Sequence, residues 1–227
     1  MRKRILSVFI IMTLFISMTA PASFAASGKT KKMKVYTDVI KVGNNVYCNL
    51  NGDYIYKVNL KTGKKTKLMT NNNKHSYGVD YMSYHKGYLY YVTSNSFDKF
   101  KYSEIGRKLY RIKVKNKKRT CLYTAKEDPD ASFRYAVKGK TVYTQYKKAI
   151  NDDYDTKLVR KKMKLNGKSK KNSKVKVKMT EKTSNKKGYS LICDTHEMED
   201  DLGYVTCYLK TPGKKIKLLR YYADFGY

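Results

Sequence analysis

The chain has 227 residues, of which 50 are Lys or Arg and 18 are Asp or Glu, so its formal net charge is +32. A charge of this size favours contact with anionic surfaces. The 41% hydrophobic content and the 23 tyrosines are atypical of a disordered basic tail and indicate a chain that buries a core. No long apolar run follows the first two dozen residues, so we expect no membrane span in the mature chain.

Residues 1–25 have the three parts of a secretory signal. Arg2, Lys3 and Arg4 form a charged start, an apolar stretch of 14 residues follows, and small residues lead up to Ala25. Fourteen residues of helix rise about 21 Å, short of the roughly 30 Å hydrocarbon core, which favours cleavage after Ala25 over an uncleaved anchor. We therefore expect a secreted, extracellular protein, held at the cell wall by charge where it stays near the cell, with a mature charge of +29.

Internal repeats are the strongest pattern in the mature chain. A short phrase recurs around Gly43, Gly87, Gly139 and Gly188, at spacings of 44, 52 and 49 residues. A second phrase follows each of these in phase, and its clearest copy, residues 54–68, alternates apolar and polar residues as a half-buried strand does. Each unit therefore predicts two hairpins, four short strands in about 45–50 residues, which is the blade length of a β-propeller.

These repeats predict an all-β fold. We expect a β-propeller-like repeat of about four four-stranded units, forming a small, partial or open propeller; a β-sandwich or meander is the alternative. The predicted organisation is a signal peptide at 1–25, a basic flexible lead-in at 26–33 and a repeat domain at 34–227. The units of that domain run approximately over 34–78, 79–132, 133–183 and 184–227.

The phrase Lys-Gly-Tyr-Leu-Tyr-Tyr at 86–91, together with residues 54–68, resembles the repeats of bacterial secreted β-propeller proteins of unknown function. That group is related to the low-density-lipoprotein-receptor-like and TolB-like propellers. The resemblance covers about residues 34–219. It implies a propeller fold and says nothing about chemistry.

The four cysteines are an even number in an exported chain, which suggests disulfides. Cys193 and Cys207 lie on predicted neighbouring strands of the last unit and are the disulfide candidate. Cys48 and Cys121 lie in different units, and the sequence leaves their state open. Four free thiols are the alternative.

Acidic residues gather in one segment of the last unit and give a weak alternative, a metal site. Hard cations such as Ca²⁺ prefer clustered carboxylates, but the acidic loops fail the EF-hand pattern and His196 lacks the helical spacing of a zinc site. We therefore favour solvated loops and expect no cofactor and no catalytic residues. The residues concerned are Asp194, His196, Glu197, Glu199, Asp200 and Asp201.

The excess of lysine is the remaining functional signal. Of the 47 mature cations, 41 are Lys and six are Arg, and Lys acts as a point charge rather than a bidentate reader of phosphates or bases. We therefore expect diffuse binding to anionic polymers and no specific nucleic acid. The candidate anion-binding residues are Lys64, Lys65, Lys117, Lys118, Lys168, Lys170, Lys171, Lys214 and Lys215.

The function that these patterns favour is an exported, non-catalytic binding module whose partner is an anionic cell-wall polymer or a protein. Two alternatives stay open: a metal-dependent polysaccharide-active enzyme that uses the acidic loops, and one part of a larger, multi-chain propeller. The sequence does not indicate the oligomeric state.

The signal anatomy gives the first testable prediction. The exported protein should begin near Ala26, because the peptidase reads the small residues just before that point. Intact-mass measurement of protein from the culture medium checks this. Secreted protein that retains residues 1–25 would contradict it.

Overall fold

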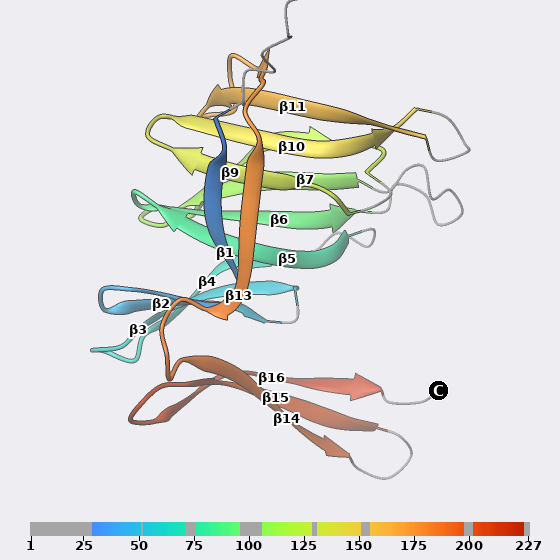
Figure 1. Cartoon of the computed structure of the whole chain (residues 1–227). Coiled ribbons are helices and arrows are strands. Elements are labelled where there is room, and N and C mark those ends of the chain that lie inside the picture. Colours follow the sequence, from blue (N-terminus) through green and yellow to red (C-terminus); the bar gives the residue numbers. More distant parts are fainter. Residues whose placement is uncertain are drawn as a thin grey trace, which may run out of the picture.

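The computed structural model describes residues 29–50, 52–70, 76–95, 106–128, 131–150, 155–197 and 202–224, and every regular element in these ranges is a β-strand. This confirms the all-β prediction. Antiparallel meanders of three or four strands stack on one another without closing into a ring within the described residues, which makes the fold an open, propeller-like one (Figure 1). No helix in the described part of the chain is long and apolar enough to cross a membrane.

The first two meanders have four strands each, and the register pair of Tyr36 on β1 with Met82 on β5 merges them into one sheet. The first consists of β1 (Lys31–Val42), β2 (Asn45–Leu50), β3 (Tyr54–Asn59) and β4 (Lys65–Thr70). The second consists of β5 (Ser76–His85), β6 (Tyr88–Asn95), β7 (Gly106–Lys113) and β8 (Lys118–Ala125). The glycines of the repeated phrase have positive φ, from 54° at Gly43 to 80° at Gly87 and Gly188, as the tight turns before β2, β6 and β14 require.

The third and fourth meanders form separate sheets. The third consists of β9 (Arg134–Lys138), β10 (Thr141–Ala149), β11 (Thr156–Lys164) and the two-residue β12 (Lys171–Asn172). The fourth has three strands, β14 (Ser190–Glu197), β15 (Leu202–Lys210) and β16 (Lys215–Asp224).

The strand before the fourth meander, β13 (Val177–Ser184), leaves the expected pattern. It pairs in parallel with β1, from Lys31 with Val177 onward, instead of pairing with β14. This pairing also explains why β1 begins at Lys31, inside the predicted flexible lead-in at 26–33: β13 supplies the hydrogen-bond partners that a free lead-in would lack. The side chain of Asn185 continues the connection, since it accepts from the backbone N–H of Lys41 and donates to its carbonyl.

Three apolar layers hold the four meanders in a stack. The sheet β14–β16 packs on β1–β3 through residues such as Cys207, Leu209 and Val58. The first meander packs on the second through Ile55 and Met82, among others. The second packs on the third through a layer rich in aromatic rings. The spatial order is therefore β14–β16, β1–β4, β5–β8 and β9–β12, with β1 and β13 crossing the stack (Figure 1).

A close backbone contact joins the first two meanders. A Cβ atom on Gly52 would lie 2.9 Å from the Cα of Gly78, and both residues have positive φ, so only glycine fits at either position. The N–H of Val79 donates to the Gly52 carbonyl at 2.9 Å. The buried Asn49 amide adds a second link by donating to the carbonyls of Thr37 and Val79.

A buried carboxylate joins the second and third meanders. Asp128 is fully buried and accepts hydrogen bonds from the Ser132 N–H and hydroxyl and from the Phe133 N–H, at 2.6–2.9 Å. Arg107 of β7 lies 3.8 Å from this carboxylate and also pairs with Asp80 of β5. Burial raises the pKa of the Asp80 carboxyl, and the Arg107 guanidinium and the Ser94 hydroxyl oppose that rise.

The second testable prediction concerns this network. Asp128→Asn should lower the free energy of unfolding by about 3 kcal/mol, because the amide cannot accept all the donors and the Arg107 charge loses a buried partner. Denaturant unfolding measures the change. Glu127→Gln is the matched control: its pair with Lys148 is 37% and 34% exposed, so about 0–1 kcal/mol is expected. Equal effects of the two substitutions would contradict the role given to Asp128.

The third prediction concerns the cysteines. Cys193 and Cys207 are opposed on β14 and β15 and form a disulfide with a Cα–Cα distance of 4.1 Å, while Cys48 is a buried and Cys121 an exposed free thiol. The double substitution Cys193→Ala and Cys207→Ala should cost about 3 kcal/mol of stability, the value for a closed loop of this length. Thermal unfolding with and without reductant measures it, with Cys121→Ser as the control. A melting temperature that reductant leaves unchanged would contradict it.

Candidate anion-binding site

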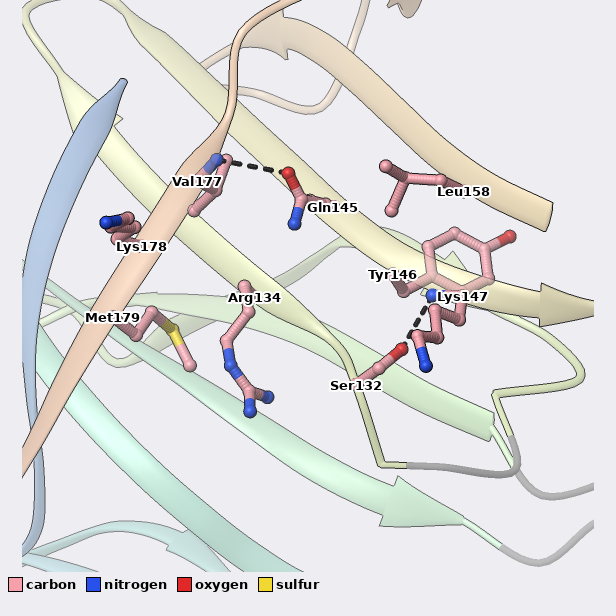
Figure 2. Close-up of a pocket in the computed structure, with 9 residues that line it drawn as sticks. All are labelled: Ser132, Arg134, Gln145, Tyr146, Lys147, Leu158, Val177, Lys178 and Met179. Atoms are coloured by element: carbon pink, nitrogen blue, oxygen red, sulfur yellow. Dashed lines mark hydrogen bonds between the residues drawn. The ribbon is translucent and has the colours of Figure 1, made fainter. Parts of the chain in front are cut away.

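A hollow of about 370 Å³ lies on the outer face of the third meander, beside β13, which crosses in front of β9 and β10 (Figure 2). Residues of β9, β10, β11 and β13 and of the loop before β9 line it. They are Ser132, Arg134, Gln145, Tyr146, Lys147, Leu158, Val177, Lys178 and Met179. Three of these nine residues are cations and none is acidic.

The alternation of β10 decides which side chains reach this face. Val142, Thr144 and Tyr146 are buried toward the second meander. Because successive side chains of a strand point to opposite faces, the residues that alternate with them, such as Gln145 and Lys147, point outward. The same alternation places Leu158, which is 52% exposed, opposite Lys147 on β11.

Gln145 organises the centre of the face. It is the register partner of both Arg134 on β9 and Arg160 on β11, so the three side chains form one row across the strands. The Gln145 carboxamide oxygen accepts from Arg160 Nε at 2.9 Å and from the Val177 N–H at 3.2 Å. One amide thereby fixes the orientation of a guanidinium and ties β13 to the sheet.

The buried Asp128 fixes the opposite wall. The Ser132 hydroxyl donates to Asp128 and accepts from the Lys147 N–H at 2.6 Å. Arg134 donates from its guanidinium to the carbonyls of Ala131 and Phe133 in the same loop, at 3.1 and 2.9 Å. The loop whose Asp128 faces Arg107 of the second meander therefore also holds Arg134, one of the cations of the hollow.

This arrangement suits a ligand whose anionic group lies next to an apolar part of the same ligand. Lys178 is exposed at the rim, and Arg134 and Arg160 lie on either side of Gln145. Guanidinium groups match carboxylates and phosphates through paired N–H donors. Leu158 and Met179 supply apolar surface beside these cations.

The lysines predicted from sequence lie elsewhere. All nine are exposed, and they are spread over four turns or turn ends: β3–β4, β7–β8, β11–β12 and β15–β16. The structure brings the first and last of these turns near each other, since Lys65 Nζ donates to the carbonyl of Lys217 at 3.1 Å. None of the nine lines the hollow. The alternation of Tyr143, Gln145 and Lys147 in β10 was the available sequence signal for the hollow, but Arg134 and Lys178 come from strands whose neighbours only the fold reveals.

The residues of the weak metal alternative lie only partly in the described part of the chain. Asp194 and His196 lie on β14, where His196 stacks on Tyr204 with ring centroids 4.7 Å apart. Glu197 ends β14, and Glu199, Asp200 and Asp201 lie outside the described residues. No group of three His, Cys, Asp or Glu side chains that could hold a metal ion occurs in the described part of the chain.

A second hollow of about 350 Å³ lies on the β1 side of the β1–β13 ribbon. Tyr36, Tyr84 and His85 line it together with Lys34 and Lys138. The His85 ring lies 3.4 Å from the Gly139 carbonyl, which connects the β5–β6 and β9–β10 turns. This contact is between two sheets, so we assign His85 to packing.

Comparison with known proteins gives only distant likenesses. No family model and no curated protein sequence matches the chain. Among solved structures, the oligogalacturonate lyase of Vibrio parahaemolyticus is 10% identical, with a TM-score of 0.38 over 78% of this chain and 50% of that one. A conserved lipoprotein from Clostridium novyi is 19% identical, with a TM-score of 0.40 over 57% and 88% of the two chains. A prolyl endopeptidase is 10% identical, with a TM-score of 0.41 over 86% and 31%.

The lyase and the endopeptidase are propeller-like, β-rich folds, and the chain spans half the length of the lyase. At these TM-scores the likenesses support no step of the functional argument.

Proposed function

We propose that this protein is an exported, non-catalytic module that binds an anionic cell-surface polymer. The observation that carries the proposal is the outer face of the third meander, where Arg134 and Arg160 flank Gln145 and Lys178 lies at the rim of a hollow without acidic lining residues. The lysines of the four turns add a positive electrostatic potential that attracts polyanions from any side.

The composition of the outer face of the third meander favours this function over membership in a larger, multi-chain propeller. Where two meanders pack in this structure, the facing side chains are apolar, such as Val58 with Leu209 or Ile55 with Met82. The outer face of the third meander instead carries Gln145, Arg160 and Lys162. Polar outer faces are the mark of terminal repeats that face water, and a further blade would bury these charges.

The fourth prediction tests the site. The double substitution Arg160→Gln and Lys178→Gln should lower affinity for heparin, used as a soluble polyanion, by about tenfold at a fixed moderate salt concentration, because charge-assisted contacts at a preorganised site are lost. The double substitution Lys64→Gln and Lys117→Gln removes the same charge from exposed turns and should cost about twofold.

Retention on heparin across a salt series measures both variants. Wild-type binding should weaken steeply with salt, since it releases counterions from the polymer. Absence of wild-type binding at low salt would overturn the proposed function. Equal losses in the two variants would place the binding in the diffuse lysine charge and not in the hollow.

A further inference from the structure

We propose that the outer face of the β14–β16 sheet is a second polymer-binding face, which takes an acidic polysaccharide strand, and that the protein therefore bridges two strands. This proposal rests on the proposed function, because it assigns the same ligand class to both ends of the stack. The β14–β16 sheet forms the end of the stack opposite β9–β12 (Figure 1).

The register shows which side chains form this face. Cys207 and Leu209 point inward to the first meander, so their neighbours along the strands point outward. Four cross-strand rows result: Ser190–Lys210–Lys215, Ile192–Tyr208–Lys217, Asp194–Thr206–Arg220 and His196–Tyr204–Tyr222. The bulge at Leu218, which is buried with the core, keeps Lys217 and Arg220 on the same outer face.

Cations outnumber acids among these twelve positions. Four of them are exposed cations: Lys210, Lys215, Lys217 and Arg220. Asp194 is the single carboxylate in the four rows. Three of the cations lie along β16: Lys215 and Lys217 are alternate residues, about 6.6 Å apart, and Arg220 follows across the bulge at Leu218. A line of positive charge at this spacing complements a polymer with an acidic group on successive units.

One of these cations is held in a fixed orientation. The Arg220 guanidinium carbon lies 3.4 Å from the centre of the Tyr204 ring, and the His196 ring stacks near the same tyrosine. A guanidinium held flat on an aromatic ring keeps its N–H donors free at the edge and loses less conformational entropy when it binds a carboxylate.

The two other tyrosines supply surface for a sugar ring. Tyr222 is 81% exposed next to Tyr204, and Tyr208 lies beside Lys217 with the Lys215 ammonium 5.8 Å from its ring centre. The electron-rich face of a tyrosine ring packs against the C–H groups of a pyranose. The arrangement thus favours an acidic polysaccharide.

The two faces lie too far apart for one short oligosaccharide to occupy both. Four meanders that stack as layers about 10 Å apart separate the outer ones by about 30 Å. Each chain should therefore bind two short oligomers, and with long polymer it should hold two strands together.

The experiment uses alginate, a polyuronate, in two steps. Alginate is attached to a surface, the full mature protein is bound at low salt, and fluorescent alginate is then added. Four proteins are compared: wild type, the Arg160→Gln and Lys178→Gln variant, a Lys217→Gln and Arg220→Gln variant, and the Lys64→Gln and Lys117→Gln control. Unfolding curves verify that all four fold, and titration calorimetry with a short oligouronate gives the number of sites.

Wild type and the control should capture the second strand and bind two oligomers per chain. The Lys217→Gln and Arg220→Gln variant should still bind the surface through the hollow, bind one oligomer, and capture at least about tenfold less fluorescent strand. Capture by this variant equal to wild type would overturn the proposal and indicate bridging by self-association. Capture of fluorescent single-stranded DNA but not of alginate would overturn the assigned ligand. Failure of wild type to bind the first alginate layer would instead count against the proposed function itself.

Discussion

The packing of the third meander on the second depends on the fully buried carboxylate of Asp128. It organises the loop between β8 and β9 by accepting from the Ser132 N–H and hydroxyl and the Phe133 N–H, and it faces Arg107 of the second meander. The same loop presents Ser132 to the backbone of Lys147 and holds Arg134 through its carbonyls. A single buried charge thus connects inter-sheet packing to the geometry of the candidate site.

The chain reconciles a charge of +32 with a packed core by separating the two in space. Its buried layers use tyrosine as a large apolar group: Tyr90, Tyr91 and Tyr135 are fully buried, and burial raises the pKa of Tyr47 to about 12, so its phenol stays neutral. Lysines occupy the turns and the outer faces, where water and salt screen their repulsion. The charge that opposes compaction is thereby placed where an anionic polymer can neutralise it.

Local patterns predicted the strands and turns well because they depend on neighbours in the sequence. The alternation in residues 54–60 and the turn glycine Gly87 specify a strand and a hairpin without reference to the rest of the chain. The parallel pairing of β13 with β1 could not be read in this way, because it joins Lys31 to Val177 and depends on which edge is open once the meanders stack. The lysine-rich turns stay a sequence-based prediction of anion binding. The row Arg134–Gln145–Arg160 could not be predicted alongside them, because it requires the register of three strands.

The central claim is that stacking leaves two basic end faces that act as the polymer-binding surfaces. Backbone-amide chemical-shift mapping of the mature protein during titration with a short oligouronate tests it most directly. The account predicts two separate groups of shifted amides, one around Gln145 and Arg160 and the other around Tyr208 and Arg220, with little change at the β3–β4 and β7–β8 turns. Shifts centred on those turns, or spread evenly over all exposed lysines, would contradict it.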